Sequence, residues 1–257
     1  MKPNLFFARS PDNTLSEPSR FYYHPADGLN SRICAFGAGT MMTQFELESR
    51  RRVMVESQIA GRGVVDVRLL DVMRRLPREA FLPPTLVDEA YEDRALGTEL
   101  GQTISQPYIV ACMTEALQIV PDHRVLEIGT GTGYQTAILS KLARHVYSVE
   151  RLEALTRSAK SRLSELGITN VTLITGDGSL GLPAEAPFDR ILVTAAAPRV
   201  VNTLVEQLRE GGRLVIPIGT VNSQRLTTIE RYRQKTIERP SIAVRFVKLI
   251  GAAGFEN

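Results

Sequence analysis

Residues 125–133 read Val-Leu-Glu-Ile-Gly-Thr-Gly-Thr-Gly, a short apolar run that ends in three alternate glycines. Glycine has no Cβ, so this segment can turn tightly from a strand into a helix and bring its backbone close to a ligand. The dinucleotide fingerprint Gly-x-Gly-x-x-Gly would require glycine at position 134, where the chain has Tyr134. The segment therefore predicts a nucleotide-like cofactor site and disfavours a nicotinamide cofactor, with a bare tight turn as the alternative.

Acidic residues accompany this glycine loop at three places. Glu127 precedes the first glycine by two residues, and an acid before Gly-x-Gly-x-Gly resembles the first motif of S-adenosylmethionine-dependent methyltransferases. Glu150 and Asp177 each close an apolar run, as residues at the carboxyl edge of a parallel sheet do. We expect Glu150 to accept hydrogen bonds from ribose hydroxyls and Asp177 to accept one from the amine of an adenine. The alternatives are a solvated surface acid for Glu150 and an Asx turn for Asp177.

Composition excludes several classes of protein. With 257 residues, 43% of them hydrophobic, the chain can form one α/β domain with an appendage. The 31 basic and 28 acidic residues nearly balance and form no long basic run with aromatics, so nucleic-acid binding is not predicted. Cys34 and Cys112 have no metal-ligand spacing, and no apolar run reaches the length of a membrane span. We expect a cytoplasmic protein without a metal or a membrane partner.

The chain divides near residue 40. Residues 1–40 are rich in Pro, Ser, Asn and Gly without periodicity, which predicts a disordered extension or a translation start at Met41 or Met42. Residues 41–257 are expected to form one domain, with a helical appendage and loop over 41–105 and a cofactor-binding core over 106–257.

Alternating periodicity gives the expected elements. Helices are predicted over 43–60, 66–76, 105–119, 134–143, 152–166 and 198–209. Strands are predicted over 125–128, 145–150, 171–177, 189–194, 213–218, 226–232 and 243–250. This order predicts a doubly wound, mostly parallel, Rossmann-like α/β sheet, with an antiparallel element from the last two strands.

A second motif is more specific than the glycine loop. Residues 101–111, Gly-Gln-Thr-Ile-Ser-Gln-Pro-Tyr-Ile-Val-Ala, together with Met-Thr-Glu at 113–115, closely resemble the signature of protein-L-isoaspartate O-methyltransferases. The similarity continues through 124–137, 176–179, 186–189 and 193–198 and spans about 43–250. It implies a monomeric cytosolic enzyme with the class I methyltransferase fold. The implied reaction transfers a methyl group from S-adenosyl-L-methionine, leaving S-adenosyl-L-homocysteine, to the free carboxylate of L-isoaspartyl residues in damaged proteins and peptides. The ester then cyclises to a succinimide, which initiates repair.

The resemblance also assigns residues. Ser105 is similar to the family's active-site serine; its alternative role is a helix N-cap, and the two roles are compatible. Thr103, Ile104 and Gln106 resemble the loop around the substrate, and Arg245 is a candidate partner of the substrate carboxylate or a surface arginine. The expected cofactor-binding residues are Glu127, Gly129, Thr130, Gly131, Thr132, Gly133, Glu150, Asp177, Gly178 and Thr194. Residues 97–100, Leu182 and Lys248 depart from the family pattern.

The chemistry fits a chain with only three histidines. A carboxylic acid has a reference pKa of about 4 and is ionised at pH 7, so its methylation requires no general base. The expected catalytic task is to align the acceptor oxygen with the methyl donor, aided by a lid over residues 98–104. Two alternatives remain: a methyltransferase for a small hydroxyl or amine compound, which would need a base, and an inactive module that binds S-adenosylmethionine.

Overall fold

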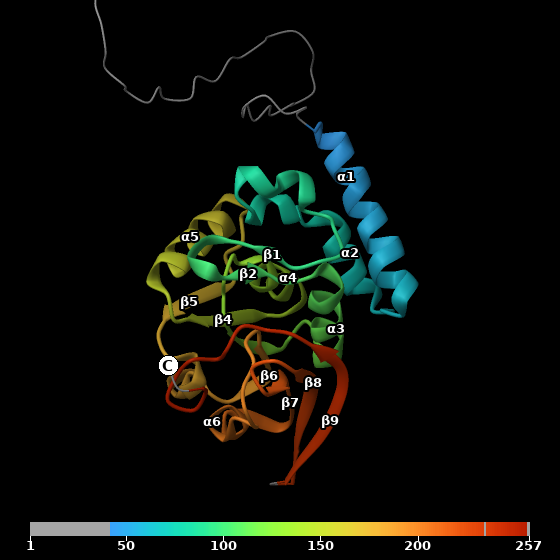
Figure 1. The fold of residues 1–257 in the computed structure, drawn as a ribbon. Coiled ribbons are helices and arrows are strands. Elements are labelled where there is room, and N and C mark those ends of the chain that lie inside the picture. Colours follow the sequence, from blue (N-terminus) through green and yellow to red (C-terminus); the bar gives the residue numbers. More distant parts are fainter. Residues whose placement is uncertain (1–41, 234, 256–257) are drawn as a thin grey trace, which may run out of the picture. The chain divides into compact units, whose positions relative to one another are not determined.

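The computed structural model describes residues 42–233 and 235–255 (Figure 1). The prediction of a disordered extension or a later start concerns residues 1–40, which lie outside the described residues. None of the helices in the described part combines the length and apolar character needed to cross a membrane.

A seven-stranded sheet forms the centre of the domain, in the order β5-β4-β3-β6-β7-β8-β9. Its strands are β3 (Arg124–Ile128), β4 (His145–Glu150), β5 (Val171–Thr175), β6 (Phe188–Val193), β7 (Leu208–Gly219), β8 (Gln224–Tyr232) and β9 (Lys235–Val244). The pairs from β5 to β7 are parallel, whereas β7 with β8 and β8 with β9 are antiparallel. The predicted fold class is therefore confirmed, including the antiparallel element at the end of the chain.

Helices surround this sheet. They are α1 (Gln44–Val53), α2 (Val67–Arg75), α3 (Pro107–Leu117), α4 (Tyr134–Leu142), α5 (Glu153–Glu165) and α6 (Asn202–Glu206). Short helical turns are η1 (Met54–Ile59), η2 (Ala60–Arg62), η3 (Arg78–Phe81), η4 (Pro84–Glu89), η5 (Glu99–Gly101), η6 (Gly178–Leu180) and η7 (Pro183–Glu185). The predicted caps act as expected at α2, where Asp66 accepts hydrogen bonds from the amides of Arg68 and Leu69.

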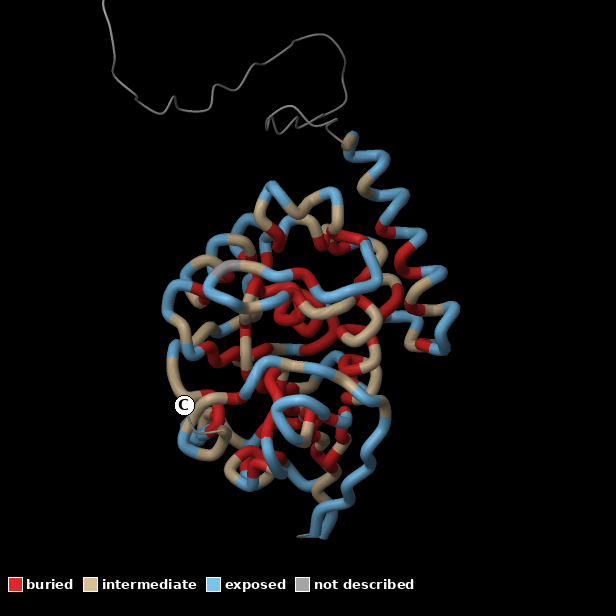
Figure 2. Tube along the Cα trace, viewed as in Figure 1, coloured by how far each residue is buried: buried red, intermediate tan, exposed pale blue. Residues whose placement is uncertain are grey.

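Alternation along the strands divides the core into two layers. Val125 belongs to the same apolar cluster as side chains of α2, α3 and α4, whereas its neighbour Leu126 belongs to a second cluster that includes Leu204 of α6. The N-terminal helices share the first layer, and α1 lies beside α2 (Figure 1). Buried residues are concentrated in the strands at the centre, while α1 and β9 are largely exposed (Figure 2).

Three predicted elements are wrong in extent, the first being β7, which begins at Leu208 and not at the predicted residue 213. The helix predicted over 198–209 is confined to α6, because the chain bends at residues 198 and 199, is extended at Val201, and enters β7 at Leu208. The strand predicted over 243–250 is instead β9, which ends at Val244 and leaves 245–250 outside any strand. β9 is an exposed edge strand, so its sequence lacks the apolar alternation of a half-buried strand.

Candidate functional site

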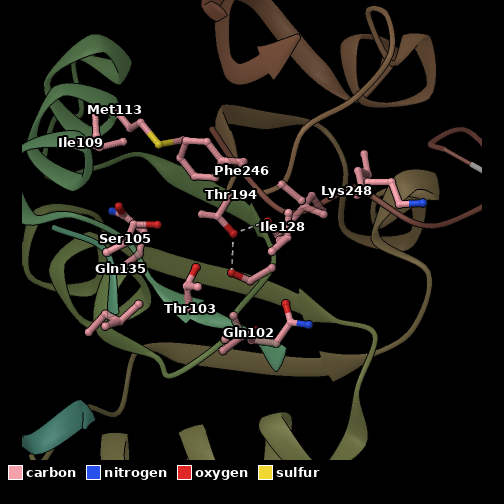
Figure 3. A pocket seen from close by; sticks show the side chains of 18 of the residues that line it. Gln102, Thr103, Ser105, Ile109, Met113, Ile128, Gln135, Thr194, Phe246 and Lys248 are labelled. Atoms are coloured by element: carbon pink, nitrogen blue, oxygen red, sulfur yellow. Dashed lines mark hydrogen bonds between the residues drawn. The ribbon is translucent and has the colours of Figure 1, made fainter. Parts of the chain in front are cut away.

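A cavity of about 740 Å³ opens at the carboxyl edge of the parallel strands. Its lining comes mainly from the loop 102–106 with the start of α3, the glycine loop with neighbouring strand ends, and the segment 243–250 near the end of the chain. In Figure 3, Ser105, Thr103 and Gln102 lie along one part of the wall, and Ile109, Met113 and Phe246 lie along another. This is the edge of the sheet at which the sequence analysis expects the residues that bind the cofactor and the substrate.

The glycine loop bends as its sequence requires. Gly129 has a φ of 96°, and a Cβ there would lie 2.3 Å from Oγ1 of Thr194, which donates a 2.7 Å hydrogen bond to the Gly129 carbonyl. Gly131 has a φ of 53° and no heavy atom within 4 Å of its Cβ position. Gly129 therefore permits close packing, and Gly131 keeps space open beside the backbone.

Glu150 lies where β4 meets the cavity and is 8% exposed. Its Oε2 accepts a 3.0 Å hydrogen bond from the amide of Gly131, and Oε1 accepts one of 3.0 Å from the amide of Leu152. A carboxylate offers about four acceptor positions, so two remain for a ligand. Glu150 is thus both a support of the glycine loop and part of the cavity wall, which rules out the solvated surface alternative.

Glu127 is fully buried beneath the loop and does not line the cavity. Its Oε2 accepts hydrogen bonds of 2.5 Å from Oγ1 of Thr136 and 2.6 Å from Oγ of Ser148, which also bonds the Thr130 hydroxyl at 2.6 Å. Oε1 is buried without a partner among the described residues. Burial raises the pKa of Glu127 to about 8. Glu127 therefore supports the glycine loop from below.

The carboxylate of Asp177 already accepts hydrogen bonds from residues of the protein itself. Oδ1 accepts hydrogen bonds from the amide and hydroxyl of Ser179 at 2.9 and 2.7 Å, and Oδ2 accepts one of 2.8 Å from the amide of Ala252. Asp177 thus begins the turn η6, as the Asx-turn alternative expected. The neighbouring Gly178 lines the cavity, and a Cβ there would lie 2.4 Å from Cγ2 of Ile128.

The remaining predicted cofactor residues lie around the same loop. Thr132 and Thr194 line the cavity with Gly129, Thr130 and Gly131. Gly133 does not line it; this residue precedes α4 with a φ of 91° and packs against Ala159 of α5. The structure therefore brings together most of the predicted cofactor residues, with Glu127, Gly133 and Asp177 set back from the surface of the cavity.

A small hairpin carries the predicted substrate loop. β1 (Leu96–Gly97) pairs with β2 (Thr103–Ile104), and the amide of Thr98 donates a 2.8 Å hydrogen bond to the carbonyl of Gln102. β2 leads directly into Ser105. The structure thereby brings Thr103, Ile104, Ser105 and Gln106 to one wall of the cavity.

The alternative role of Ser105 as the helix cap is wrong. The N-cap of α3 is Gln106, whose side-chain amide is engaged with Asp93, by hydrogen bonds of 3.0 Å to the carbonyl and 2.8 Å to the carboxylate. The Ser105 hydroxyl lines the cavity and makes no hydrogen bond to another described residue. It is therefore available to a ligand.

The last wall includes residues that sequence reasoning did not assign. Arg245, the candidate partner of the substrate carboxylate, lines the cavity together with Phe246 and Lys248. The carbonyl of Val247 accepts a 2.8 Å hydrogen bond from Ala196, and the amide of Phe246 donates one of 3.0 Å to the side chain of Gln224. Because these partners are distant in the chain, no local sequence pattern indicates the contacts. Gln135, which also lines the cavity, could have been suspected from its position two residues after Gly133.

The sheet order and the glycine loop at its carboxyl edge define a class I S-adenosylmethionine-dependent methyltransferase. A solved structure titled protein-L-isoaspartate O-methyltransferase is 32% identical, with a TM-score of 0.71, and the match covers 79% of this chain and 67% of that one. A second, a putative protein-L-isoaspartate O-methyltransferase from Plasmodium falciparum in complex with S-adenosyl-L-homocysteine, is 25% identical with a TM-score of 0.67, over 78% of this chain and 98% of that one.

Sequence comparisons agree with the structural ones. Protein-L-isoaspartate O-methyltransferase 2 of Pelobacter propionicus is 50% identical over 81% of this chain and 93% of its own length. The protein-L-isoaspartate O-methyltransferase of Methanoregula boonei is 49% identical over 84% of this chain and 100% of its own length. The family model of protein-L-isoaspartate(D-aspartate) O-methyltransferase matches residues 49–254. The chain belongs to the protein-L-isoaspartate(D-aspartate) O-methyltransferase family.

Proposed function

We propose that this protein transfers a methyl group from S-adenosyl-L-methionine to the free carboxylate of L-isoaspartyl residues in damaged proteins and peptides. Family membership supports the reaction. The observation that carries it is one cavity that is lined both by the glycine loop and by Ser105, whose hydroxyl is available. The methyl ester formed is the precursor of a succinimide, whose hydrolysis partly restores aspartate, so the enzyme initiates the repair.

The cavity wall suits S-adenosylmethionine. The open space at Gly131 lets the backbone approach the cofactor, and the two spare acceptor positions of Glu150 suit the two ribose hydroxyls. Asp177 keeps about one acceptor position on Oδ2, but it is set back from the cavity, so its contact with the amine of an adenine stays a prediction. Thr194 holds the loop in shape from behind Gly129. The bound cofactor supplies an electrophilic methyl group on a positively charged sulfur.

Ser105 acts on the acceptor. Its hydroxyl donates a hydrogen bond to one carboxylate oxygen, which leaves the other oxygen to form the new C–O bond as the S–C bond breaks. Arg245, on the facing segment, supplies positive charge for the same carboxylate, and the Thr103–Gln106 stretch completes the wall. No proton has to be removed. Alignment of the reacting atoms is therefore the main contribution, and intramolecular analogues gain about 7 to 11 kcal/mol from it.

The test is transfer of radiolabelled methyl from S-adenosylmethionine to an isoaspartyl peptide, with the matched aspartyl peptide as control. Base-labile label on the isoaspartyl peptide alone is the expected result. Cofactor binding without labelling would favour the alternative acceptor, a small hydroxyl or amine compound. Absence of cofactor binding would favour the inactive module.

Assembly and location belong to the same proposal. We expect a monomer that works in the cytoplasm on isoaspartyl proteins and peptides, without nucleic-acid or membrane partners. Light scattering of the purified full chain gives its mass in solution. A mass equal to two chains or more would contradict the monomer.

A further inference from the structure

Arg78, the first residue of η3, is a fully buried cation. Its Nε donates a 2.8 Å hydrogen bond to the carbonyl of Ala90, and Nη2 donates one of 2.9 Å to the carbonyl of Ser105. Nη1 is buried and has no partner, and no carboxylate pairs with Arg78 among the residues that the structure describes. The guanidinium carbon lies 4.9 Å from the centre of the Tyr134 ring.

A buried charge without a carboxylate partner destabilises the folded state. Burial of an unpaired ion costs several kcal/mol, and burial lowers the pKa of Arg78, although arginine keeps its proton in proteins. If residue 78 only had to fill space in the core, an apolar side chain of similar volume would give a more stable fold. The retained guanidinium therefore points to a function of its donors at the two carbonyls.

The contacts of Arg78 join the two walls of the cavity. Ser105, whose carbonyl it holds, belongs to the substrate wall, and Tyr134 follows directly on the glycine loop as the first residue of α4. Because the guanidinium is planar and rigid, it fixes the direction of both hydrogen bonds at once. The backbone at Ser105 is thus set relative to the start of α4.

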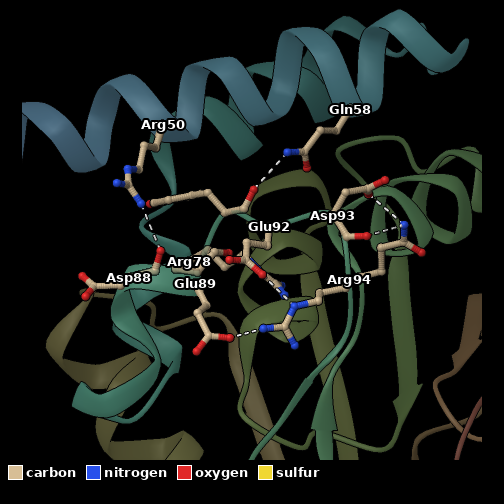
Figure 4. Close-up of polar contacts among 11 residues, drawn as sticks. Arg50, Gln58, Arg78, Asp88, Glu89, Glu92, Asp93 and Arg94 are labelled. Carbon is tan, nitrogen blue, oxygen red and sulfur yellow. Dashed lines mark hydrogen bonds and ion pairs between the residues drawn. The ribbon is translucent and has the colours of Figure 1, made fainter.

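The other carbonyl partner is itself well anchored. Ala90 lies in the segment 88–94, and Figure 4 shows Arg78 beside this segment, which α1 and η1 overlie. Arg50 donates a 3.0 Å hydrogen bond to the carbonyl of Asp88, and Gln58 donates one of 3.0 Å to the carbonyl of Tyr91. Arg78 therefore connects Ser105 to a fixed support rather than to a free loop.

We propose that Arg78 is a positioning residue for methyl transfer, which acts through the backbone of Ser105 and holds its hydroxyl toward the acceptor carboxylate. The proposal rests on the proposed function of Ser105. It differs from a merely structural role in that the loss of Arg78 affects turnover only while the Ser105 hydroxyl is present.

The experiment compares Arg78→Lys with wild type, and uses Arg75→Lys, an exposed arginine paired with Asp71, as the matched control. Lysine keeps the charge but cannot hold both carbonyls in a fixed plane. We expect kcat for an isoaspartyl peptide to fall about 10- to 100-fold, the loss given by a charged hydrogen bond, while the Kd for S-adenosylhomocysteine changes less than about twofold. Arg75→Lys should leave both values unchanged.

A double-mutant cycle with Ser105→Ala provides the decisive comparison. If Arg78 acts through Ser105, Arg78→Lys lowers kcat less than about twofold in the Ser105→Ala background. An equal loss in both backgrounds would overturn the proposal. If wild type methylates no isoaspartyl peptide, the proposed function fails instead, and the two failures are distinguishable.

Hydrogen exchange tests the anchoring without any turnover. The amides of residues 103–106 should exchange slowly in wild type and faster in Arg78→Lys, with the strands of the parallel sheet unchanged. Should Arg78→Lys not fold, Arg78→Gln, which removes the buried charge and keeps a donor, replaces it. Exchange of 103–106 in wild type as fast as in an unstructured peptide contradicts the proposal whichever variants fold.

Discussion

Burial favours the neutral form of Glu127 beneath the glycine loop. Its carboxyl has no cationic partner among the described residues, and burial raises its pKa from 4.5 to about 8. An acid whose pKa is higher in the folded state binds a proton that the unfolded chain has already lost. Its contribution to stability is full below pH 4.5 and is lost as the pH rises through about 8.

We therefore expect Glu127→Gln to change the pH dependence of folding. In wild type this residue lowers the free energy of unfolding between pH 4.5 and 8 by at most about 1.4 kcal/mol per pH unit. Glutamine does not titrate, so the variant should show a shallower decline across this range. Urea unfolding at several pH values measures the slope, and identical slopes in both proteins would show that Glu127 is ionised when folded.

Two glycines of the loop should respond differently to alanine. Gly129→Ala places a Cβ 2.3 Å from Thr194 Oγ1 and should destabilise the fold, whereas Gly131→Ala meets nothing and adds only the strain of a positive φ, about 1 kcal/mol. Gly131→Ala should nevertheless lose most of its affinity for S-adenosylhomocysteine. Calorimetric titration of the folded variant measures this, and an unchanged Kd would remove Gly131 from the cofactor site.

The sequence predicted a helix cap correctly where the cap bonds only to residues next to it in the chain. Asp66 caps α2 as its sequence predicts, because the cap bonds only to amides two and three residues later. Ser105 fails as a cap because the α3 start uses Gln106, whose side chain is taken up by Asp93. That partner is distant in sequence, so no local pattern contains it.

At the scale of elements, α1 is attached by a buried polar cluster. Arg51 donates hydrogen bonds of 2.8 Å to the Tyr91 hydroxyl and 3.0 Å to Glu79, and Tyr91 also bonds Glu79. The sequence 44–53 is rich in charges and resembles a solvated helix face, so it conceals this contact. Only the fold places Glu79 and Tyr91 opposite it.

Arg51→Ala should consequently destabilise the protein strongly. It leaves Glu79, whose side chain is only 11% exposed, without its cation, and the loss of one partner of a largely buried pair costs about 3 to 5 kcal/mol. The exposed pair of Arg75 and Asp71 is the control, since Arg75→Ala should cost less than about 1 kcal/mol. Urea unfolding provides both values. Equal small losses would mean that the Arg51 cluster contributes little net stability.

The limits of the strands were also predicted well where the local sequence determines them and poorly where distant contacts do. The central parallel strands β3, β4 and β6 were predicted closely because they are largely buried and each reads as an apolar run. β9 was missed because an exposed edge strand needs no apolar pattern, and the segment 245–250 was read as a strand although only isolated bridges involve it. The cavity wall that contains Phe246 and Lys248 follows from these bridges and so escaped prediction.

For the whole molecule, the cavity is lined by parts of the chain that are distant in sequence, among them 102–106, 128–132 and 243–250. The cofactor site therefore exists only when the domain is folded. A ligand that binds the native state alone raises the free energy of unfolding, by about 2.7 kcal/mol at 100 times its Kd.

We accordingly expect S-adenosylhomocysteine at about 100 times its Kd to stabilise wild type by about 2.7 kcal/mol, as measured by urea unfolding with and without the ligand. Ser105→Ala should keep this gain in full, because its hydroxyl is proposed to contact only the acceptor. Gly131→Ala at the same ligand concentration should lose most of the gain, because its Cβ fills the space beside the backbone. Full stabilisation of Gly131→Ala together with its loss in Ser105→Ala would reverse the assignment of the two walls, with the loop that carries Ser105 holding the cofactor and the glycine loop facing the isoaspartyl substrate.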